Sequence, residues 1–272
     1  PRLVDAAFAY EGAADEASFA LGPALVGLLA VAIDPGGALL AGAALLAVFG
    51  TAFALDQSAV RTHAYALTHA HLGGAGRLLS VALVVLALAQ LCIGVLFGAT
   101  QTGATVLATA AGNPGAAGFV HATLGVGSAV AGLATAYLPA RIGYERRALG
   151  AAVALVVLST PLLLVGSLLT VTLAVLALGC AVAPYMIAVF TLGERVVPPA
   201  RVGAAMTVLA SATGVGYALG ASVAGRVADA TGSHTGAFAV TVTTTVVATV
   251  LLAVSQHRLV SEKREDQELV PA

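Results

Sequence analysis

Charge is scarce in this sequence. Lys, Arg, Asp and Glu make up 9% of its 272 residues, against about 25% in an ordinary soluble domain. Hydrophobic residues account for 59%, so too few polar side chains remain to cover a water-soluble globule. The net charge of −1 also argues against a nucleic-acid partner, which would require a basic patch. No glycine-rich phosphate loop of the Walker type occurs, which argues against ATP hydrolysis by this chain.

Long charge-free runs dominate what is present. A bilayer core about 30 Å thick requires roughly 20 apolar residues of helix. Eight runs meet this requirement, at 13–33, 37–55, 78–110, 116–138, 148–165, 168–192, 202–225 and 236–256, and only the first contains acidic or basic residues, Asp15 and Glu16 near its start. The third is too long for one straight span, and its three glycines, Gly94, Gly98 and Gly103, favour either a bend or a helix that extends past the membrane. The sequence predicts an all-α, polytopic transmembrane helix bundle of about eight spans.

The basic residues fix an orientation for these spans. With eight spans, eleven of the twelve Lys and Arg residues fall on one side: Arg2, Arg61, Arg77, Arg141, Arg146, Arg147, Arg195, Arg201, Arg258, Lys263 and Arg264. Only Arg226 lies near the opposite face. Cytoplasmic loops of membrane proteins carry an excess of positive charge, so both termini are expected in the cytoplasm of a multi-pass plasma-membrane protein.

One long hydrophilic connection, residues 56–77, divides the spans two plus six. We therefore expect the last two helices of a first half over 1–55, a central cytoplasmic loop over 56–77, a six-helix second half over 78–256 and a cytoplasmic tail over 257–272. Transporters built from two six-helix halves have this layout, with four further spans expected ahead of residue 1. The loop histidines His63, His69 and His71 lack nearby Cys or acidic ligands, so no metal site is predicted.

Small residues recur at four-residue spacing in two spans. The seventh carries Ala212, Gly216, Gly220 and Ala224, and the fourth carries Ser128, Gly132 and Ala136. Such stripes allow helix backbones to approach closely in lipid, where packing rather than water exclusion drives association. We interpret both as packing seams, which a rocking motion could also use.

Polar side chains within spans are the default functional candidates, because burying them in lipid is costly. Gln90, Thr100, Gln101 and Thr102 of the third span either line a substrate cavity or hydrogen-bond to neighbouring helices. Tyr185 follows Pro184 in the sixth span. The pair is either a hinge with an aromatic cavity wall or an ordinary packed tyrosine beside a kink.

Three acidic residues, Glu11, Asp15 and Glu16, open the first span. Glu11 and Asp15 are four residues apart and share a helix face. They could couple transport to protons or cations at the cytoplasmic mouth. Alternatively, they lie among the lipid headgroups, where carboxylates suit a helix N-terminus.

Several segments, in order, resemble those of a major facilitator superfamily permease. Residues 11–30 resemble its fifth helix, 94–118 its seventh helix and the following turn, and 139–147 its basic loop between helices eight and nine; residues 197–201 and 216–232 resemble the loop before helix eleven and the close of that helix. The likeness covers essentially the whole chain as the carboxy-terminal two thirds of such a permease, and is greatest to actinobacterial drug and sugar efflux-like members.

The resemblance implies a bend at Gly22, Pro23 and Gly27 that takes part in conformational exchange. It also implies gating by a loop of which only part is present: Gly132, Arg141, Gly143, Arg146 and Arg147 remain. The acid expected four residues after Gly132 is replaced by Ala136, and an acid that often opens helix eleven is replaced by Gly203.

The function implied is secondary active transport by alternating access, with proton-coupled efflux of a small neutral or amphiphilic solute. No cofactor and no catalytic residue is expected, and the oligomeric state is left open. One alternative is a nonfunctional truncated transporter. Another is an intramembrane enzyme, disfavoured because convergent Ser, His or Asp groups at membrane depth are missing and only His121 enters a span.

Overall fold

The computed structural model describes residues 18, 21–22, 25–56, 80–139, 141–198 and 201–268, with side chains described as far as Gln256. All regular structure in these ranges is helical. The α-helices are α2 (Pro35–Ala54), α4 (Val81–Ala110), α5 (Ala116–Ala134), α6 (Tyr144–Ser159), α7 (Leu168–Arg195), α8 (Val202–Thr231) and α9 (His234–Glu268). Two 3₁₀ turns, η1 (Thr135–Tyr137) and η2 (Thr160–Leu164), extend α5 and α6, and residues 25–32 are also helical.

Seven helices in the described ranges are long and apolar enough to cross a bilayer. They match seven of the eight expected spans, and the eighth, 13–33, is described only in part. The third run forms one uninterrupted helix, α4, of 30 residues. At about 1.5 Å per residue it is longer than a bilayer core is thick, so of the two expected alternatives the structure has the overlong helix. The fold is therefore a polytopic helical membrane bundle.

Local sequence signals set the helix ends. Asp34 caps α2 by accepting from the Gly37 amide at 2.8 Å, ahead of Pro35 at the first position. Ser80 caps α4 in the same way, and Ser167 and Thr170 form a capping box at α7. These side chains satisfy backbone N–H groups that have no partner within their own helix.

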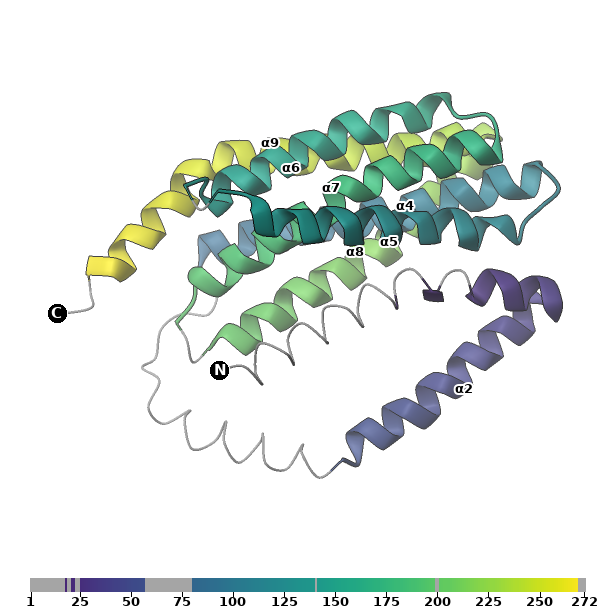
Figure 1. The fold of residues 1–272 in the computed structure, drawn as a ribbon, viewed down its shortest axis with the longest axis horizontal. Coiled ribbons are helices and arrows are strands. Elements are labelled where there is room, and N and C mark those ends of the chain that lie inside the picture. The colour runs from purple at the N-terminus through teal and green to yellow at the C-terminus, as the bar shows by residue number, and fades with distance from the viewer. Residues whose placement is uncertain are drawn as a thin grey trace.

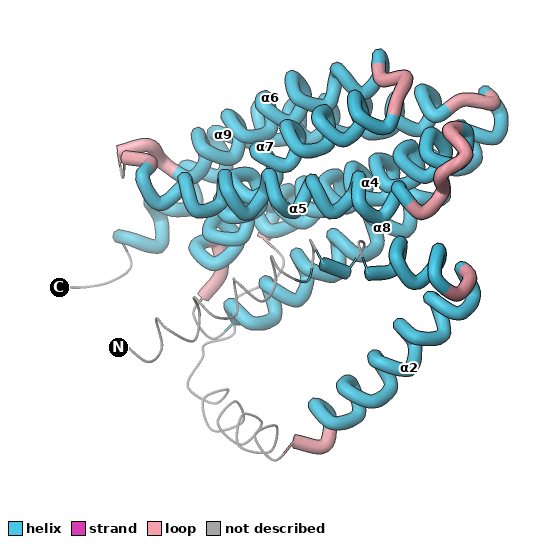
Figure 2. The backbone as a smooth tube through the Cα atoms, turned by 45° about the vertical axis from the view of Figure 1, so that its right-hand side comes forward, coloured by secondary structure: helices cyan, strands magenta, loops and turns pink. Residues whose placement is uncertain are grey.

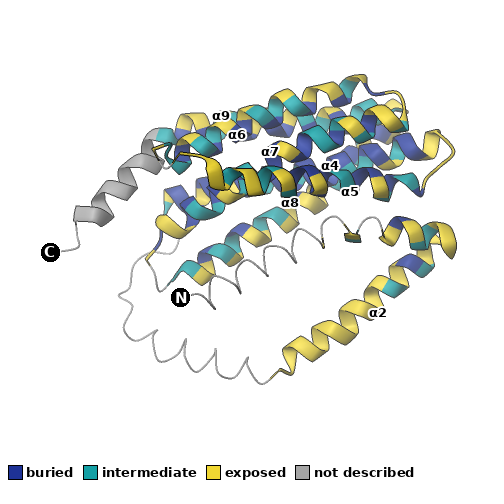
Figure 3. Ribbon diagram, viewed as in Figure 1, coloured by how far each residue is buried: buried dark blue, intermediate teal, exposed yellow. Residues whose placement is uncertain are grey.

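Helices α4 to α9 form one bundle with α4 at its centre (Figures 1 and 2). Helix α4 packs against α5, α7, α8 and α9, and α6 lies across α7 and α9. Its core is aliphatic, with Leu83, Leu86, Ile93 and Leu96 of α4 all buried. Helix α2 stands apart from this bundle, and its surface is almost entirely exposed (Figure 3).

Glycines set the closest contacts of the bundle. A Cβ at Gly94 or Gly98 of α4 would collide with the backbone of α8 at Thr213 or Tyr217, and one at Gly216 of α8 would collide with the backbone of α4. The two helices therefore meet backbone to backbone, as small-residue seams allow in lipid. The expected seam on α8 is confirmed for Gly216, and also for Gly220 and Ala224, which are buried.

The expected stripe on the fourth span is only partly correct. Helix α5 ends at Ala134, so Ala136 lies in the 3₁₀ turn η1 and is exposed. The seam between α5 and α7 instead uses Gly127, where a Cβ would strike Leu176, and Gly179 of α7, where a Cβ would strike Leu124. A change of helix type at the end of α5 removes the last member of the pattern from the contact face.

Basic residues from two helices meet at one end of the bundle. The guanidinium groups of Arg147 from α6 and Arg195 from α7 both lie over the ring of Tyr144, at 4.8 and 4.5 Å from its centroid. The α5–α6 and α7–α8 connections therefore lie at the same end, which we call the basic end. The α4–α5 connection lies at the opposite end of the bundle (Figure 1).

Candidate substrate cavity

A cavity of about 670 Å³ lies between the 25–32 helix, α4, α5 and α8. Its wall includes Pro35 at the start of α2 and Pro114 and Gly115 in the α4–α5 connection, which places it toward the end of the bundle opposite the basic end. Most of the lining is aliphatic, with Val26 and Val31 on one side. The volume is in the range of sites that hold drug-sized ligands, about 300–1,000 Å³.

The polar side of this cavity comes from α4 and α8. The hydroxyl of Tyr217 donates to Oε1 of Gln101, joining residues that are far apart in sequence. Thr105, one turn after Gln101 on α4, also lines the cavity and donates to the Gln101 carbonyl at 2.9 Å. A smaller cavity of about 280 Å³ shares these three residues and adds Thr102 to the wall. The Gln101–Tyr217 pair therefore contributes to the walls of both cavities.

His121 of α5 completes the polar lining. The residue is 6% exposed and contributes to the cavity wall. Its Nδ1 atom is buried without a hydrogen-bond partner among the described residues. Buried polar atoms in native proteins are nearly always hydrogen-bonded, so the imidazole has hydrogen-bonding capacity that the described residues do not use.

The remaining wall is formed where the 25–32 helix and the start of α5 are in close backbone contact. A Cβ at Gly27 would lie 2.8 Å from the Gly115 carbonyl and 3.3 Å from Cα of Gly118. The 25–32 helix therefore touches the start of α5 directly, at a position where only glycine fits. A Cβ at Gly22, by contrast, would meet no atom within 4 Å, and Pro23 lies outside the described residues.

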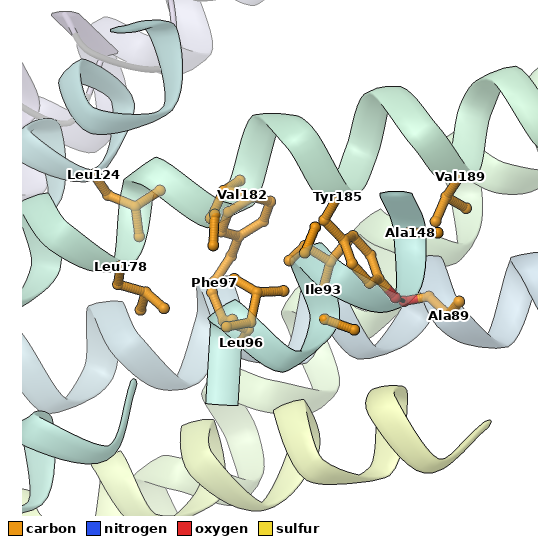
Figure 4. Packing of buried hydrophobic residues seen from close by; sticks show 14 of the residues in the cluster. Ala89, Ile93, Leu96, Phe97, Leu124, Ala148, Leu178, Val182, Tyr185 and Val189 are labelled. Carbon is orange, nitrogen blue, oxygen red and sulfur yellow. Dashed lines mark hydrogen bonds between the residues drawn. The ribbon is translucent and has the colours of Figure 1, made fainter. Parts of the chain in front are cut away.

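Three polar candidates lie in the bundle interior rather than in the described cavities. Thr100 is fully buried, with its Oγ1 3.2 Å from Oγ1 of Thr241 on α9. Tyr185 is also fully buried, and its hydroxyl donates to the Ala89 carbonyl at 2.8 Å; Figure 4 shows its ring among aliphatic side chains of the core. Gln90 is fully buried, and neither of its amide atoms has a partner among the described residues.

The sequence from residue 86 to residue 271 matches the family model of the Major Facilitator Superfamily. The chain belongs to the major facilitator superfamily. No curated protein and no solved structure matches it. Members of the major facilitator superfamily are generally transporters rather than enzymes, so the chain is a multi-pass membrane protein of a transporter family, with lipid around its helices and a small solute as its expected cargo.

Arg147 stabilises, through hydrogen bonds, the loop at residues 139–147 that resembles the superfamily's gating loop. Its Nε donates to the Ile142 carbonyl at 2.9 Å, and one terminal nitrogen donates to the Pro139 carbonyl at 3.0 Å. Gly143 is the N-cap residue of α6. Arg141 and Arg146 are exposed at the basic end. Gly132 faces α7, where a Cβ would lie 3.2 Å from Cβ of Ala183.

The remaining candidates of this superfamily member fall outside the described residues. These are the acidic residues at the start of the first span, Glu11, Asp15 and Glu16, and the loop histidines His63, His69 and His71. The coupling role of the acidic residues and the expected lack of a metal site at the histidines stay predictions.

Like Thr105, the cavity residues His121 and Tyr217 were not among the candidates drawn from the sequence. His121 stands only a few residues inside a span, where an imidazole is easily assigned to the headgroup region. Tyr217 lies inside a run of small residues that indicates packing. The available signal was the rarity of polar side chains within the spans, which applies to both.

Proposed function

We propose that this protein is a secondary active transporter that moves a small neutral or amphiphilic solute by alternating access. The observation that carries the proposal is the cavity between the 25–32 helix and α4, α5 and α8, apolar over most of its wall and polar at Gln101, Tyr217 and His121. A solute of modest polarity could leave water for such a site without losing all of its hydrogen bonds.

The finer assignments follow the resemblance and the charge distribution. We propose efflux as the direction and protons as the coupling ion, with Glu11, Asp15 and Glu16 as the coupling groups. Both termini and the basic end would face the cytoplasm, since positive charge accumulates on that side. The division into a two-helix segment over 1–55 and a six-helix half over 78–256 accompanies this proposal, with the helices corresponding to the fifth to twelfth of the superfamily.

Flux through proteoliposomes tests the proposal. The purified protein is reconstituted with an imposed proton gradient and offered a panel of radiolabelled neutral sugars and uncharged amphiphilic dyes. We expect at least one solute to move at a rate that collapses when a protonophore dissipates the gradient. No movement of any solute above protein-free liposomes would contradict the proposal.

A pair of variants locates the pathway. Gln101→Leu replaces a polar cavity residue with an apolar one of similar size and is expected to lower flux about tenfold, equivalent to about 1.4 kcal/mol of lost stabilisation along the pathway. Thr51→Val makes a polar-to-apolar change on the exposed surface of α2 and is expected to leave flux unchanged. Equal flux in both variants would place the pathway elsewhere.

A further inference from the structure

The polar groups of the cavity wall use only part of their hydrogen-bonding capacity within the protein. Tyr217 uses its hydroxyl hydrogen on Oε1 of Gln101. The Gln101 amide nitrogen, with two hydrogens, and the lone pairs of the Tyr217 oxygen are then left for a ligand. Thr105 has likewise used its hydrogen on a backbone carbonyl and can only accept. The α4–α8 side of the cavity therefore offers both a donor and acceptors within a short stretch.

His121 adds a second, independent feature. Its ring belongs to the cavity wall, it is buried, and its Nδ1 lacks a partner among the described residues. A neutral imidazole has one N–H donor and one acceptor nitrogen, so it can bond a group that both donates and accepts. An unpaired buried nitrogen is unfavourable, and the described residues leave this part of the hydrogen-bonding capacity of His121 unused.

The rest of the wall limits what such a ligand can be. The lining contains no Asp, Glu, Lys or Arg among the described residues, so a charged solute would enter without a counter-ion, at a large desolvation cost. A sugar, with polar groups on every side, would leave several hydroxyls against Val26, Ala30 and Val31. A molecule with one polar end and an apolar body suits both surfaces.

We propose that the cavity recognises an uncharged solute with an apolar body and one terminal hydroxyl or primary amide, which His121 and the Gln101–Tyr217 pair bind through hydrogen bonds. This inference rests on the proposed function, since it names the class of solute taken by the same cavity. It assigns to His121 the role of selecting solutes that can donate a hydrogen bond over similar ones that can only accept.

Three naphthalene probes with the same apolar body and different polar ends test the selection. They are 2-(2-naphthyl)ethanol, its methyl ether and the corresponding trimethylammonium ion, each measured by equilibrium dialysis against the purified full chain, with protein-free micelles as background. The alcohol is expected to bind about fivefold more tightly than the ether, the effect of one hydrogen bond, and the ammonium ion most weakly. Equal affinity for alcohol and ether, or preference for the cation, overturns the proposal.

Variants assign the preference to the named side chains. His121→Phe keeps an aromatic ring but removes both nitrogens, and the alcohol-to-ether ratio is expected to fall to near one. The control His234→Phe alters a histidine at the start of α9 that bonds the Val165 carbonyl, and should retain the fivefold ratio. If His121→Phe does not fold, Tyr217→Phe is expected to lower the ratio at least twofold, with the exposed Tyr137→Phe as its control.

The alcohol-to-ether affinity ratio allows this inference and the proposed function to be tested independently. Solute flux in proteoliposomes together with an alcohol-to-ether ratio near one in the unaltered protein would overturn the inference and leave transport standing. Retention of the full ratio in both His121→Phe and Tyr217→Phe would also overturn it. Failure of all three probes to bind, with no flux of any solute, would overturn both.

Discussion

Helices α2 and α4 look alike in sequence and differ sharply in the structure. Over the most apolar 18 residues of each helix the mean hydropathies are 2.0 and 2.6, yet 6% of that stretch of α2 and 67% of that of α4 are buried inside the protein. Both contain glycine. A Cβ at Gly42 of α2 would meet nothing within 4 Å, whereas one at Gly98 of α4 would meet the backbone of α8. Hydropathy therefore identifies helices that belong in lipid without distinguishing those that pack against protein.

The physical reason is that lipid tails are as apolar as a leucine side chain, so burying leucine against another helix gains little hydrophobic energy. Helix association in lipid is instead stabilised by close backbone approach and by hydrogen bonds between helices. Helix α4 has both, through its glycines facing α8 and the Thr100–Thr241 contact with α9. The difference between α4 and α2 can be tested by making the same substitution in each.

The largest effect is expected for Gly98→Leu. Even a Cβ at this position would lie 2.6 Å from the Ala221 amide nitrogen, so the substitution must push α4 and α8 apart. Overpacking of this kind costs about 3 kcal/mol, visible as a lower midpoint of thermal unfolding in detergent. Gly42→Leu on α2 is the matched control and should not lower it. Similar losses in the two variants would remove the distinction between the helices.

A somewhat smaller effect is expected for Leu86→Ala. Leu86 is fully buried on α4, while Leu46 on α2 is 76% exposed. Truncating the buried side chain leaves a cavity and costs about 2–3 kcal/mol. Leu46→Ala should change the unfolding free energy by less than about 0.5 kcal/mol. A loss at Leu46 as large as that at Leu86 would show that α2 is packed as tightly as α4.

The third substitution should stabilise the protein. Gln90 of α4 is buried with both amide atoms unpartnered among the described residues, so Gln90→Leu removes a desolvation penalty and is expected to add about 1 kcal/mol to the unfolding free energy. Gln256→Leu is the matched change on α9, where the amide donates to the Glu145 carbonyl at 3.0 Å. There the unfolding midpoint should fall. A lower midpoint for Gln90→Leu would contradict this interpretation.

The smallest effect concerns the hydroxyl pair between α4 and α9. Thr100→Val should cost about 0.6 kcal/mol, the average for such bonds within a membrane protein. A double-mutant cycle with Thr241→Val isolates the pairwise coupling, which should account for most of that loss. Thr51→Val on α2 supplies the reference for a threonine on an exposed face. Coupling indistinguishable from zero would mean that the two hydroxyls do not bond.

Much of the fold could be predicted from the sequence, because the thickness of the bilayer sets the length of the apolar spans. The α8 seam was also predictable, since Gly216 and Gly220 recur at helical spacing. Ala136 was misassigned because the sequence does not show where α5 gives way to a 3₁₀ turn. The low burial of α2 could not be predicted from its composition, because that composition resembles the composition of α4.

The candidate site was only partly predictable. Gln101 stood out as a polar residue within a span, and it lies in the cavity. Its partner Tyr217 is on a helix far along the chain, and only the packing of α4 against α8 brings the two together. Thr100, adjacent in sequence to Gln101, faces α9 instead. A helix rotates each successive residue by about 100°, so neighbours in sequence occupy different surfaces.

The most direct test of alternating access uses a single thiol at the cavity. Cys92 and Cys180, the two native thiols, are replaced by serine, and Gln101→Cys or the fully buried Leu86→Cys is introduced. A membrane-impermeant maleimide is then applied to right-side-out and inside-out vesicles. We predict labelling at position 101 from both faces and none at position 86. Labelling of position 101 from one face only, or from neither, would contradict the assignment of this cavity to a transport pathway.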